Sequence, residues 1–420
     1  MNDSIILIYP LIIKNKGRRK RIKYLGLYIH IPFCASKCGY CDFYSVKADE
    51  KTQNAYTEAL LMQLKEYSLP AKNNMIDSVF IGGGTPTCIG TDRLLKIIKN
   101  IKSLFSLSKN TEFTLETNPK TADLKGLKAL YKSGVNRLSI GMQSSNDREL
   151  KLLSRIHSFG DFEECYGAAR AAGFENVNVD IMYGIPAQTP GSFFETLKKT
   201  VLLKPEHISV YGLKIEPGTL FYKHQKDLLL YLPSEEEERG MYFLCRGFLE
   251  KNGYLQYEIS NFSVKGRQCR HNLKYWTCSE YLGLGTGAHS YFAGCRFSFK
   301  KDIKEYIKNF NHNETTLEQA DIFDYEKYNL FDEHTKISPN ERIGEYIMLA
   351  MRLNAGISKN KFSQLFHKDF DGAYYKKLEP FIESGHIVKT SAGYAFSPEG
   401  MFVSNYILGR IIDFDQNIKS

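Results

Sequence analysis

The chain has 420 residues, 43% of them hydrophobic and 25% charged, which excludes a disordered chain, a collagen-like repeat and a small disulfide scaffold and predicts two or more globular domains. Its formal charge of +9 is concentrated at one end: residues 1–24 hold seven basic side chains and one acidic, or +6, so the remaining body carries only +3. A nearly neutral body argues against a nucleic-acid-binding protein, because phosphate binding needs basic residues clustered on the folded domain.

Cysteine usage indicates the compartment. The nine cysteines are an odd number, and no cleavable secretion signal accompanies them. Disulfide frameworks pair their cysteines and belong to oxidising compartments. We therefore expect a reducing, cytoplasmic setting.

Residues 1–24 form an N-terminal extension in which an apolar run, IILIYPLII at 5–13, precedes a basic cluster at 14–23. This order is the reverse of a signal peptide, and the apolar run is too short to span a bilayer, which takes about 20 residues. Two interpretations are open. Residues 5–23 form a weak tether to an anionic membrane surface, which makes the protein peripheral to the membrane. Alternatively, the extension is a disordered tail or the product of an upstream start codon.

From residue 26 onward, short β-rich runs alternate with helical segments. The helical segments carry apolar residues at three- and four-residue steps, as in Leu94, Leu95, Ile98, Ile101 and Leu104. Repeated strand–helix units predict an α/β fold with a parallel sheet. The predicted strands are 26–33, 78–84, 112–119, 137–144, 176–185 and 207–217, and the helices between them are 52–67, 91–104, 121–133, 160–172 and 189–203.

Residues suited to ligand binding collect where these strands end. Cys34 follows the first strand, residues 82–85 end the second, and Glu116, Gln143 and Asp180 lie in the next three. Ligands of parallel sheets and barrels bind at the carboxyl ends of the strands. The sequence therefore predicts one binding rim that gathers all of them.

The alternation of strands and helices ends after the sixth predicted strand. Residues 221–300 combine a helical stretch near 234–252 with a glycine-rich segment, YLGLGTGAHSY at 281–291, and predict a connector over the barrel mouth.

Residues 301–420 predict a separate C-terminal domain. Helical patterns near 339–353 and 358–367, a helix at 372–384 and a hairpin-like segment at 385–400 follow in the order of a winged helix, so we expect a small winged-helix-like α+β domain. Acidic residues stand among its basic ones, which favours packing or partner binding over DNA binding. They are Glu341, Glu345, Asp369 and Asp371.

Three cysteines carry the chemistry. Cys34, Cys38 and Cys41 stand in CASKCGYC at C-x3-C-x2-C spacing, on a loop directly after a predicted strand. Three thiolates can hold three irons of a [4Fe–4S] cluster, whose usual protein complement is four cysteines, and leave the fourth iron open for another ligand. The alternative is a structural zinc site, which needs a fourth ligand such as the more distant Cys88 or a His or Asp.

The segment YIHIPFCASKCGYCDF (28–43) resembles the signature of the radical S-adenosylmethionine (SAM) enzymes, in the branch related to oxygen-independent coproporphyrinogen III oxidase. The resemblance extends from about residue 26 to the end of the chain. It implies a partial (βα)6 radical SAM barrel over residues 25–220, a [4Fe–4S] cluster, and SAM bound at its open iron. In this family the reduced cluster cleaves SAM to a 5′-deoxyadenosyl radical, so the cofactor supplies the difficult chemistry.

The resemblance also implies a set of SAM-binding residues. In GGGTPT (82–87), glycine would let the backbone approach the methionine end of SAM, because a Cβ would block it. Taken singly, Glu116 and Asp180 could instead be strand-end caps, and Arg155 could form a surface ion pair. The implied SAM contacts are Tyr28, Tyr40, Gly83, Gly84, Thr85, Glu116, Gln143, Arg155 and Asp180.

Three features separate the members of this branch. The oxidase carries a fourth cysteine two residues after the third, where this chain has Phe43, and it has a long N-terminal arm where only 27 residues precede Tyr28 here. The segment Arg270–Trp276, RHNLKYW, resembles the HNxxYW motif of the HemW-type haem chaperones.

The HNxxYW motif implies a haem site. His271 would ligate the haem iron, and Tyr275 and Trp276 would flank the macrocycle. Alternatively, His271 is a structural hydrogen-bonding residue and the two aromatic residues belong to the core. Cys269 and Cys278, which flank the motif, offer a further haem ligand.

Two functions follow. The first is a haem chaperone that binds haem as cargo and delivers it to client haem proteins, with cluster-linked homodimers expected by family analogy. The second is an oxygen-independent coproporphyrinogen III oxidase, which converts propionate side chains to vinyl groups. Phe43, the short extension and HNxxYW favour the first. Whether SAM is cleaved in function is left open.

Overall fold

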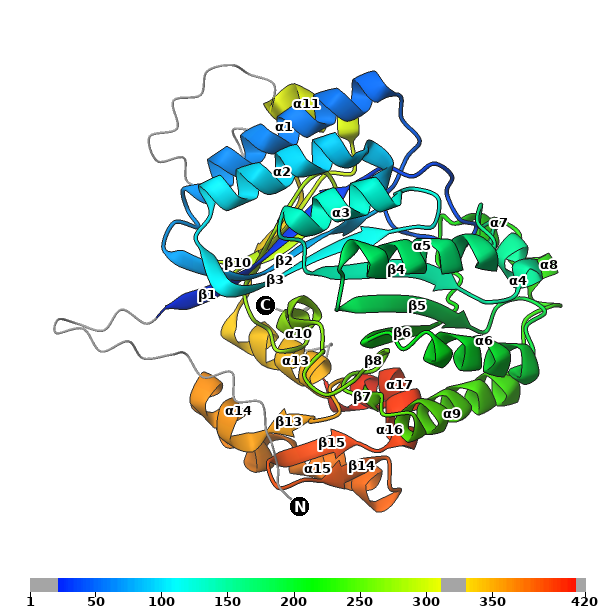
Figure 1. Cartoon of the computed structure of the whole chain (residues 1–420). Helices are drawn as coiled ribbons and strands as arrows, with labels where there is room; N and C mark the ends of the chain where they lie inside the picture. The colour runs from blue at the N-terminus through cyan, green and yellow to red at the C-terminus, as the bar shows by residue number, and fades with distance from the viewer. Residues whose placement is uncertain (1–21, 311–329, 413–420) are drawn as a thin grey trace.

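The structure is a computed structural model that describes residues 22–310 and 330–412 (Figure 1). Its centre is a sheet in which six parallel strands lie side by side in chain order. This confirms the predicted parallel α/β architecture and its six strands. They are β1 (Lys23–Ile31), β2 (Asn74–Gly83), β3 (Leu107–Thr117), β4 (Arg137–Gln143), β5 (Val177–Tyr183) and β6 (His207–Gly212).

Helices between the strands cover the outer face of the sheet (Figure 1). In α2 (Thr91–Leu104), the apolar stripe of Leu94, Ile97, Ile98 and Ile101 is buried against the sheet. Each such burial contributes about 1.5–3 kcal/mol. The others are α1 (Glu50–Ser68), α3 (Leu124–Lys132), α4 (Asp147–Leu152), α5 (Phe159–Ala172) and α6 (Pro190–Leu202), with the 3-10 turn η1 (Pro86–Ile89) and the short α7 (Leu220–Lys223) and α8 (Gln225–Leu228).

The predicted connector is wrong for most of residues 221–300, because they extend the sheet at both edges. On one side β9 (Tyr281–Leu284) pairs in parallel with β1 and leads to β10 (His289–Phe292) and β11 (Cys295–Phe299). On the other side β8 (Asn261–Ser263) pairs antiparallel with β6 and β7 (Leu255–Gln256) pairs with β8. Strands of two to five residues leave too few alternating positions to be read from the sequence.

Three helices accompany these edge strands. α9 (Glu235–Lys251) packs against α6, and α11 (Ile303–Phe310) packs against α1. α10 (Arg270–Trp276) lies on the inner side of the sheet, in contact with β2 (Figure 1).

The C-terminal part has its own core and the predicted order of three helices and a hairpin, with an unpredicted short strand between the first two helices. The predicted boundary at residue 301 is displaced, because β12 (Phe331–Lys336) pairs with β11 of the large sheet. The second core therefore starts with α13. Its elements are α13 (Pro339–Ala350), β13 (Ile357–Ser358), α14 (Lys359–Phe366), α15 (Phe370–Glu383), β14 (Ile387–Lys389), β15 (Gly393–Phe396), α16 (Pro398–Phe402) and α17 (Ser404–Ile411).

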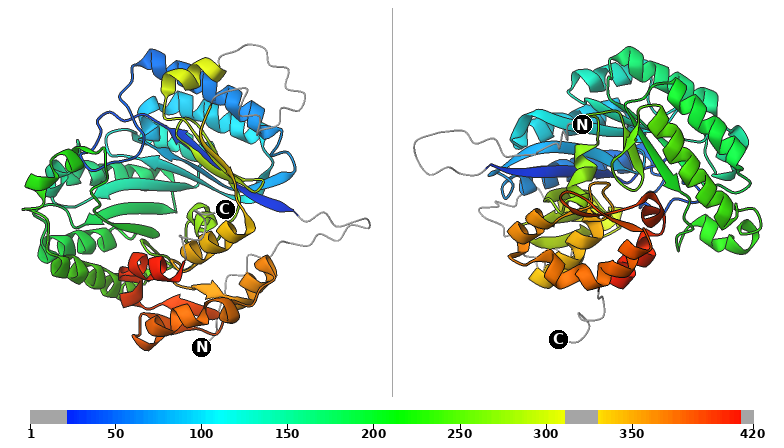
Figure 2. Two further views of the ribbon diagram at one scale, coloured as in Figure 1. Left: turned by 180° about the vertical axis from the view of Figure 1, so that it is seen from behind. Right: turned by 90° about the horizontal axis from the view of Figure 1, so that it is seen from below.

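The C-terminal domain lies on the side of the sheet opposite α1–α3 (Figures 1 and 2). A β-bridge between Glu258 and Leu353 and a hydrogen bond from Asn354 N to the Tyr257 carbonyl, 3.1 Å long, join it to the barrel. All seven residues of β4, near the middle of the sheet, are buried.

Most of the predicted N-terminal extension lies outside the described residues, including the apolar run at 5–13. Within residues 22–310 and 330–412, no helix has the length and apolar character needed to cross a membrane.

Candidate functional site

A cavity of about 840 Å³ opens at the carboxyl ends of the parallel strands. The cysteine loop, the ends of β2 to β6, α10 and the C-terminal domain all contribute to its lining. The structure thus brings together all the predicted site residues except Tyr28 and His271. Those that line the cavity are Cys34, Cys38, Tyr40, Cys41, Gly83, Gly84, Thr85, Glu116, Gln143, Arg155, Asp180, Tyr275 and Trp276.

The cysteine loop is held by backbone hydrogen bonds on both sides. Cys34 N donates to the Val46 carbonyl (3.1 Å), and the Gly39 carbonyl accepts from Phe221 N (2.9 Å). All three thiols are half-buried, and burial, followed by the neighbouring Cys38 and Cys34, raises the pKa of Cys41 to about 11. Cationic iron would relieve both effects, because metal binding deprotonates a thiol.

These thiols suit a cluster with one thiolate per iron. In the described part of the chain, no three His, Cys, Asp or Glu side chains converge on a position for a single metal ion.

A polar chain links two of the cysteines. Thr85 Oγ1 lies 3.5 Å from Cys34 Sγ and accepts from Asn118 Nδ2 (2.6 Å). Arg155 donates to Asn118 Oδ1 (2.7 Å), to the Gly141 carbonyl (2.8 Å) and to Cys38 Sγ (3.5 Å). Arg155 Nε is buried and has no hydrogen-bond partner among the described residues, so a donor is left for a ligand. The sequence placed Asn118 with Glu116 at the end of the third predicted strand, on the predicted binding rim, without a specific role.

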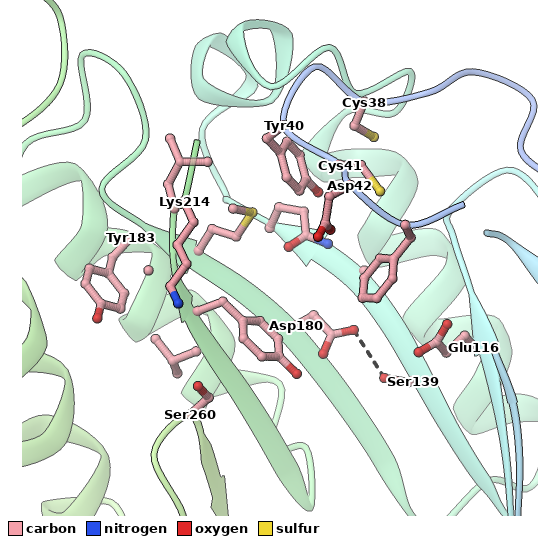
Figure 3. A pocket seen from close by; sticks show the side chains of 18 of the residues that line it. Cys38, Tyr40, Cys41, Asp42, Glu116, Ser139, Asp180, Tyr183, Lys214 and Ser260 are labelled. Carbon is pink, nitrogen blue, oxygen red and sulfur yellow. Dashed lines mark hydrogen bonds between the residues drawn. The ribbon is translucent and has the colours of Figure 1, made fainter. Parts of the chain in front are cut away.

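Two carboxyl groups line the cavity further along the sheet (Figure 3). Glu116 accepts a hydrogen bond from Gly83 N (3.1 Å), and Asp180 accepts from Ser139 Oγ (3.1 Å) and Asn178 Nδ2 (2.8 Å). Burial, followed by the negative charge of Asp180, raises the pKa of Glu116 to about 8. Burial also raises the pKa of Asp180. Two carboxyls in this setting would gain from a positively charged ligand.

The glycines at the end of β2 are required by the packing of the protein itself, and their approach to SAM stays a prediction. A Cβ on Gly83, whose φ is +112°, would lie 2.6 Å from the His30 ring, and a Cβ on Gly84 would lie 2.5 Å from the Phe33 carbonyl oxygen. β1 and the residues that follow it therefore leave no room for a side chain at these two positions, even without a ligand. Gln143 also has a positive φ, of 68°, at a register shift that follows Gly141 in β4.

Tyr28 is not among the residues that line the cavity, and its place beside SAM stays a prediction. Its hydroxyl lies 3.0 Å from His30 Nδ1, and its ring packs beside Phe80 and His271. Tyr40 does line the cavity, and its ring packs edge-on against Phe221.

His271 is not presented to a haem in this structure. It is 0% exposed, with Nδ1 3.0 Å from Ser78 Oγ and Nε2 3.0 Å from Tyr275 Oη. Burial, followed by the positive charges of Lys274 and Arg137, lowers its pKa to about 3, so the ring is neutral. An iron could bind it only after one of these hydrogen bonds broke. These hydrogen bonds agree with the structural interpretation of His271, whose role as a haem ligand stays a prediction, whereas Tyr275 and Trp276 line the cavity.

Cys269 and Cys278 do not line the cavity either. Cys269 is buried with Sγ 3.6 Å from Glu112 Oε1, and Cys278 packs against the C-terminal core. Neither is placed as a further haem ligand.

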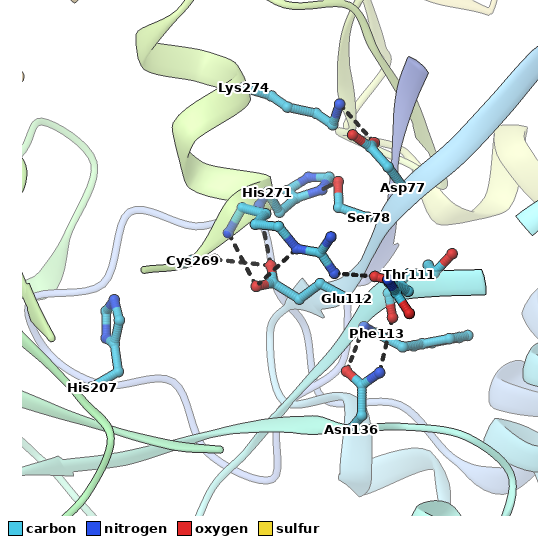
Figure 4. A network of polar contacts seen from close by, with 12 residues as sticks. Asp77, Ser78, Thr111, Glu112, Phe113, Asn136, His207, Cys269, His271 and Lys274 are labelled. Atoms are coloured by element: carbon cyan, nitrogen blue, oxygen red, sulfur yellow. Dashed lines mark hydrogen bonds and ion pairs between the residues drawn. The ribbon is translucent and has the colours of Figure 1, made fainter. Parts of the chain in front are cut away.

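The helix α10 that carries the motif is anchored by the sheet (Figure 4). Glu112 of β3 accepts hydrogen bonds from the backbone N–H groups of Arg270 and His271, both 3.1 Å long, in place of a side-chain cap. Lys274 and Asp77 form an ion pair of 2.7 Å. The orientation of Tyr275 and Trp276 thus depends on contacts with β2 and β3.

Comparison with known proteins agrees with this site. Residues 28–200 match the Radical SAM superfamily, and residues 337–403 match the HemN C-terminal domain. The "Heme chaperone HemW" of Bacillus subtilis is 33% identical over 92% of this chain and 98% of that protein. The chain belongs to the HemW family. Radical SAM membership implies a [4Fe–4S] cluster and SAM, which favours a cluster over a zinc site.

Other relatives extend the comparison. The mitochondrial "Radical S-adenosyl methionine domain-containing protein 1" of Bos taurus is 30% identical over 91% of this chain and 86% of that protein. Among solved structures, the coproporphyrinogen III oxidase (HemN) of Escherichia coli superposes with a TM-score of 0.80 at 22% identity and covers 94% of this chain and 91% of that one. This likeness shows a shared fold.

Replacing Glu112 tests the anchoring of α10. Glu112→Ala leaves two backbone N–H groups of the helix without their acceptor, so we expect the free energy of unfolding to fall by about 2–3 kcal/mol. The fluorescence of Trp276, the single tryptophan of the chain, should shift to the red. The matched control is Glu58→Ala, which removes an exposed ion pair with Lys96 and should change neither quantity. Equal stability and emission in the two variants would contradict the anchoring role.

The raised pKa of Glu116 predicts a pH dependence. The folded protein keeps a proton that the unfolded chain, with the ordinary pKa of 4.5, releases, so the free energy of unfolding should fall as pH rises from about 4.5 to about 8. The glutamine side chain of Glu116→Gln cannot ionise. In this variant the fall in the free energy of unfolding between these two pH values should therefore be smaller by about 2–5 kcal/mol. Chemical denaturation across this pH range measures it, and parallel profiles for the two proteins would show that Glu116 titrates normally.

Proposed function

We propose that this protein is a haem chaperone, which holds a [4Fe–4S] cluster and SAM, binds haem and delivers it to client haem proteins. The observation that carries the proposal is the continuity of one cavity from Cys34, Cys38 and Cys41 to Tyr275 and Trp276. The cluster residues and the aromatic residues of the HNxxYW motif therefore share one binding space. The names of the most similar relatives, which are heme chaperones, agree with this function.

The cofactors would occupy the strand-end side of the cavity. Each of the three thiolates would hold one iron, and SAM would complete the coordination of the fourth. SAM contacts are proposed for residues that line this part of the cavity, and the unpartnered Nε of Arg155 supports a ligand there. They are Tyr40, Gly83, Gly84, Thr85, Glu116, Gln143, Arg155 and Asp180. SAM would supply a deoxyadenosyl radical if it were cleaved.

Haem would lie against Tyr275 and Trp276. Their rings offer flat apolar surfaces, which suit a macrocycle. His271 supports Tyr275 through its hydrogen bond and is not exposed to the cavity. We therefore propose the two aromatic residues as the haem contacts and give His271 a positioning role.

The second candidate, coproporphyrinogen III oxidase, is disfavoured by Phe43. This side chain stands at the position of that enzyme's fourth cysteine, is 63% exposed and lines the cavity. Nothing in its chemistry replaces a thiol.

The remaining predictions concern partners and compartment. A homodimer, a membrane contact through residues 5–23 and independence from nucleic acid stay predictions. A cytoplasmic location is supported by the nine cysteines, all of them free thiols.

An anaerobic haem titration of the cluster-reconstituted protein, followed by the Soret band, tests the proposal. We expect saturable binding by the wild type. Trp276→Ala should weaken it about tenfold, because a ring contact of about 1–1.5 kcal/mol is lost. Trp276→Phe, which keeps an aromatic face, should bind more tightly than the alanine variant.

Tyr406→Ala is the matched control, because Tyr406 is 63% exposed and lies outside the cavity lining. Its haem affinity should equal that of the wild type. If the wild type shows no saturable haem binding and turns over coproporphyrinogen, its function is that of the oxidase and not of the chaperone. If a folded His271→Ala variant loses the Soret band but retains the Trp276 emission, His271 is a ligand of the haem iron.

A further inference from the structure

Two side chains that line the cavity, at the joint between the barrel and the C-terminal domain, each hold a buried polar atom without a partner. Glu258 is 0% exposed, and its Oε2 accepts a hydrogen bond from Ser260 N (3.2 Å), but its Oε1 has no hydrogen-bond partner among the described residues. Arg352 is half-buried, and its Nη2 donates to Asn405 Oδ1 (2.8 Å), but its buried Nε has no partner within residues 22–310 and 330–412. Buried polar atoms are normally paired, so we expect the missing partners from a bound molecule.

The joint holds these two side chains near each other. Glu258 and Leu353 form a β-bridge, and Asn354 Nδ2 donates to the Gln256 carbonyl (2.7 Å). Arg352 precedes Leu353 in the chain, and its positive charge acts on the carboxyl of Glu258. The two unpaired atoms are nevertheless not bonded to each other. One group of a bound molecule can therefore supply the partner of both.

Glu258 is about half protonated at neutral pH. Burial raises its pKa to about 7, and the positive charge of Arg352 offsets this only in part. Tyr211 of β6 and Tyr257 also act on Glu258, but desolvation raises the pKa of both phenols, so they stay neutral. A protonated carboxyl can donate through its O–H, and a guanidinium is always a donor. In this form the joint offers two donors and one positive charge, which suits a carboxylate.

One helix links this joint to the aromatic residues proposed as haem contacts. Arg352 follows α13 by two residues, and α13 packs against α10, which carries Tyr275 and Trp276. All three side chains line the same cavity. A molecule that lies against the two rings and reaches the joint needs a flat ring system with a carboxylate at its edge. Haem, with its two propionate side chains, has this chemistry.

We propose that Arg352 and protonated Glu258 together bind a propionate carboxylate of haem, and so fix the macrocycle between the barrel and the C-terminal domain. This inference rests on the haem-chaperone function proposed above. The carboxylate of SAM has the same chemistry, and the test below distinguishes the two sources. Binding in this way keeps the proton on Glu258, because two ionised carboxylates in one buried site repel each other. Haem affinity should therefore fall as the pH rises above about 7.

The test compares haem with haem dimethyl ester, in which both propionates are masked, on the cluster-reconstituted full chain at about pH 6 and about pH 8.5. At the lower pH the wild type should bind haem about tenfold more tightly than the ester, because esterification removes charge-assisted hydrogen bonds. At the higher pH this preference should be lost, because ionised Glu258 repels the carboxylate. The comparison needs no substitution, so the test stands even if a variant fails to fold.

Three variants separate the two side chains. Glu258→Gln, whose amide is a donor at every pH, should keep the preference for haem at both pH values. Arg352→Gln should bind haem and ester equally at both, and Arg352→Lys should restore part of the preference at the lower pH. SAM affinity, measured by calorimetry without haem, should stay unchanged in all three variants.

Glu399→Gln and Arg410→Gln are the matched controls. Both residues are exposed, on α16 and α17 of the same domain, and neither lines the cavity. Each variant should keep the wild-type preference for haem and its loss at the higher pH.

Four results overturn the inference, and they are distinguishable. Equal binding of haem and ester by the wild type at the lower pH removes the role of a propionate while the chaperone function stands. A preference that is the same at both pH values, or that is lost with rising pH in Glu258→Gln as well, removes Glu258 from the site. Loss of SAM affinity with unchanged haem affinity in Arg352→Gln assigns the joint to the carboxylate of SAM. A wild type that binds no haem overturns the chaperone function itself, and this inference with it.

Discussion

The close approach of the end of β2 to β1 is the constraint on which the site depends. Side chains at Gly83 and Gly84 would collide with His30 and with the Phe33 backbone, so only glycine lets the two strand ends meet. His30 is itself fixed, with Nε2 3.0 Å from the Tyr44 carbonyl oxygen and Nδ1 3.0 Å from the Tyr28 hydroxyl. Because the cysteine loop starts directly after β1, this contact sets the position of the thiols against Thr85 and the rest of the cavity.

From that contact, the polar chain through Thr85, Asn118 and Arg155 runs across the ends of the next strands. It gathers groups from β3, β4 and the loop after α4 around two of the thiols. Each hydrogen bond is modest alone, but buried polar groups are costly to leave unpaired, so the chain resists rearrangement. The cavity thereby has one rigid side, formed by the strand ends and suited to a cluster and a small cationic cofactor.

The other side of the cavity is built by residues distant in sequence. α10 is fastened to β2 and β3 by Ser78, Asp77 and Glu112, and the C-terminal domain adds Arg352, Phe402 and Asn405 to the lining. His271 therefore serves the cavity indirectly, through the position of its helix and of Tyr275. The HNxxYW motif can thus be required for haem binding although its histidine, His271, does not line the cavity.

The sequence by itself determined the strand–helix alternation, the cysteine spacing and the family, because periodicity and local motifs are properties of neighbouring residues. It also placed Glu116, Gln143 and Asp180 on one rim, since parallel strands end on the same side. Only the tertiary structure decided that strands within 255–299 complete the sheet and that both ring nitrogens of His271 are occupied by hydrogen bonds to Ser78 and Tyr275. These outcomes depend on pairing and burial between segments up to about two hundred residues apart, such as Ser78 with His271. No local sequence pattern shows which residues at such a contact stay accessible to a ligand.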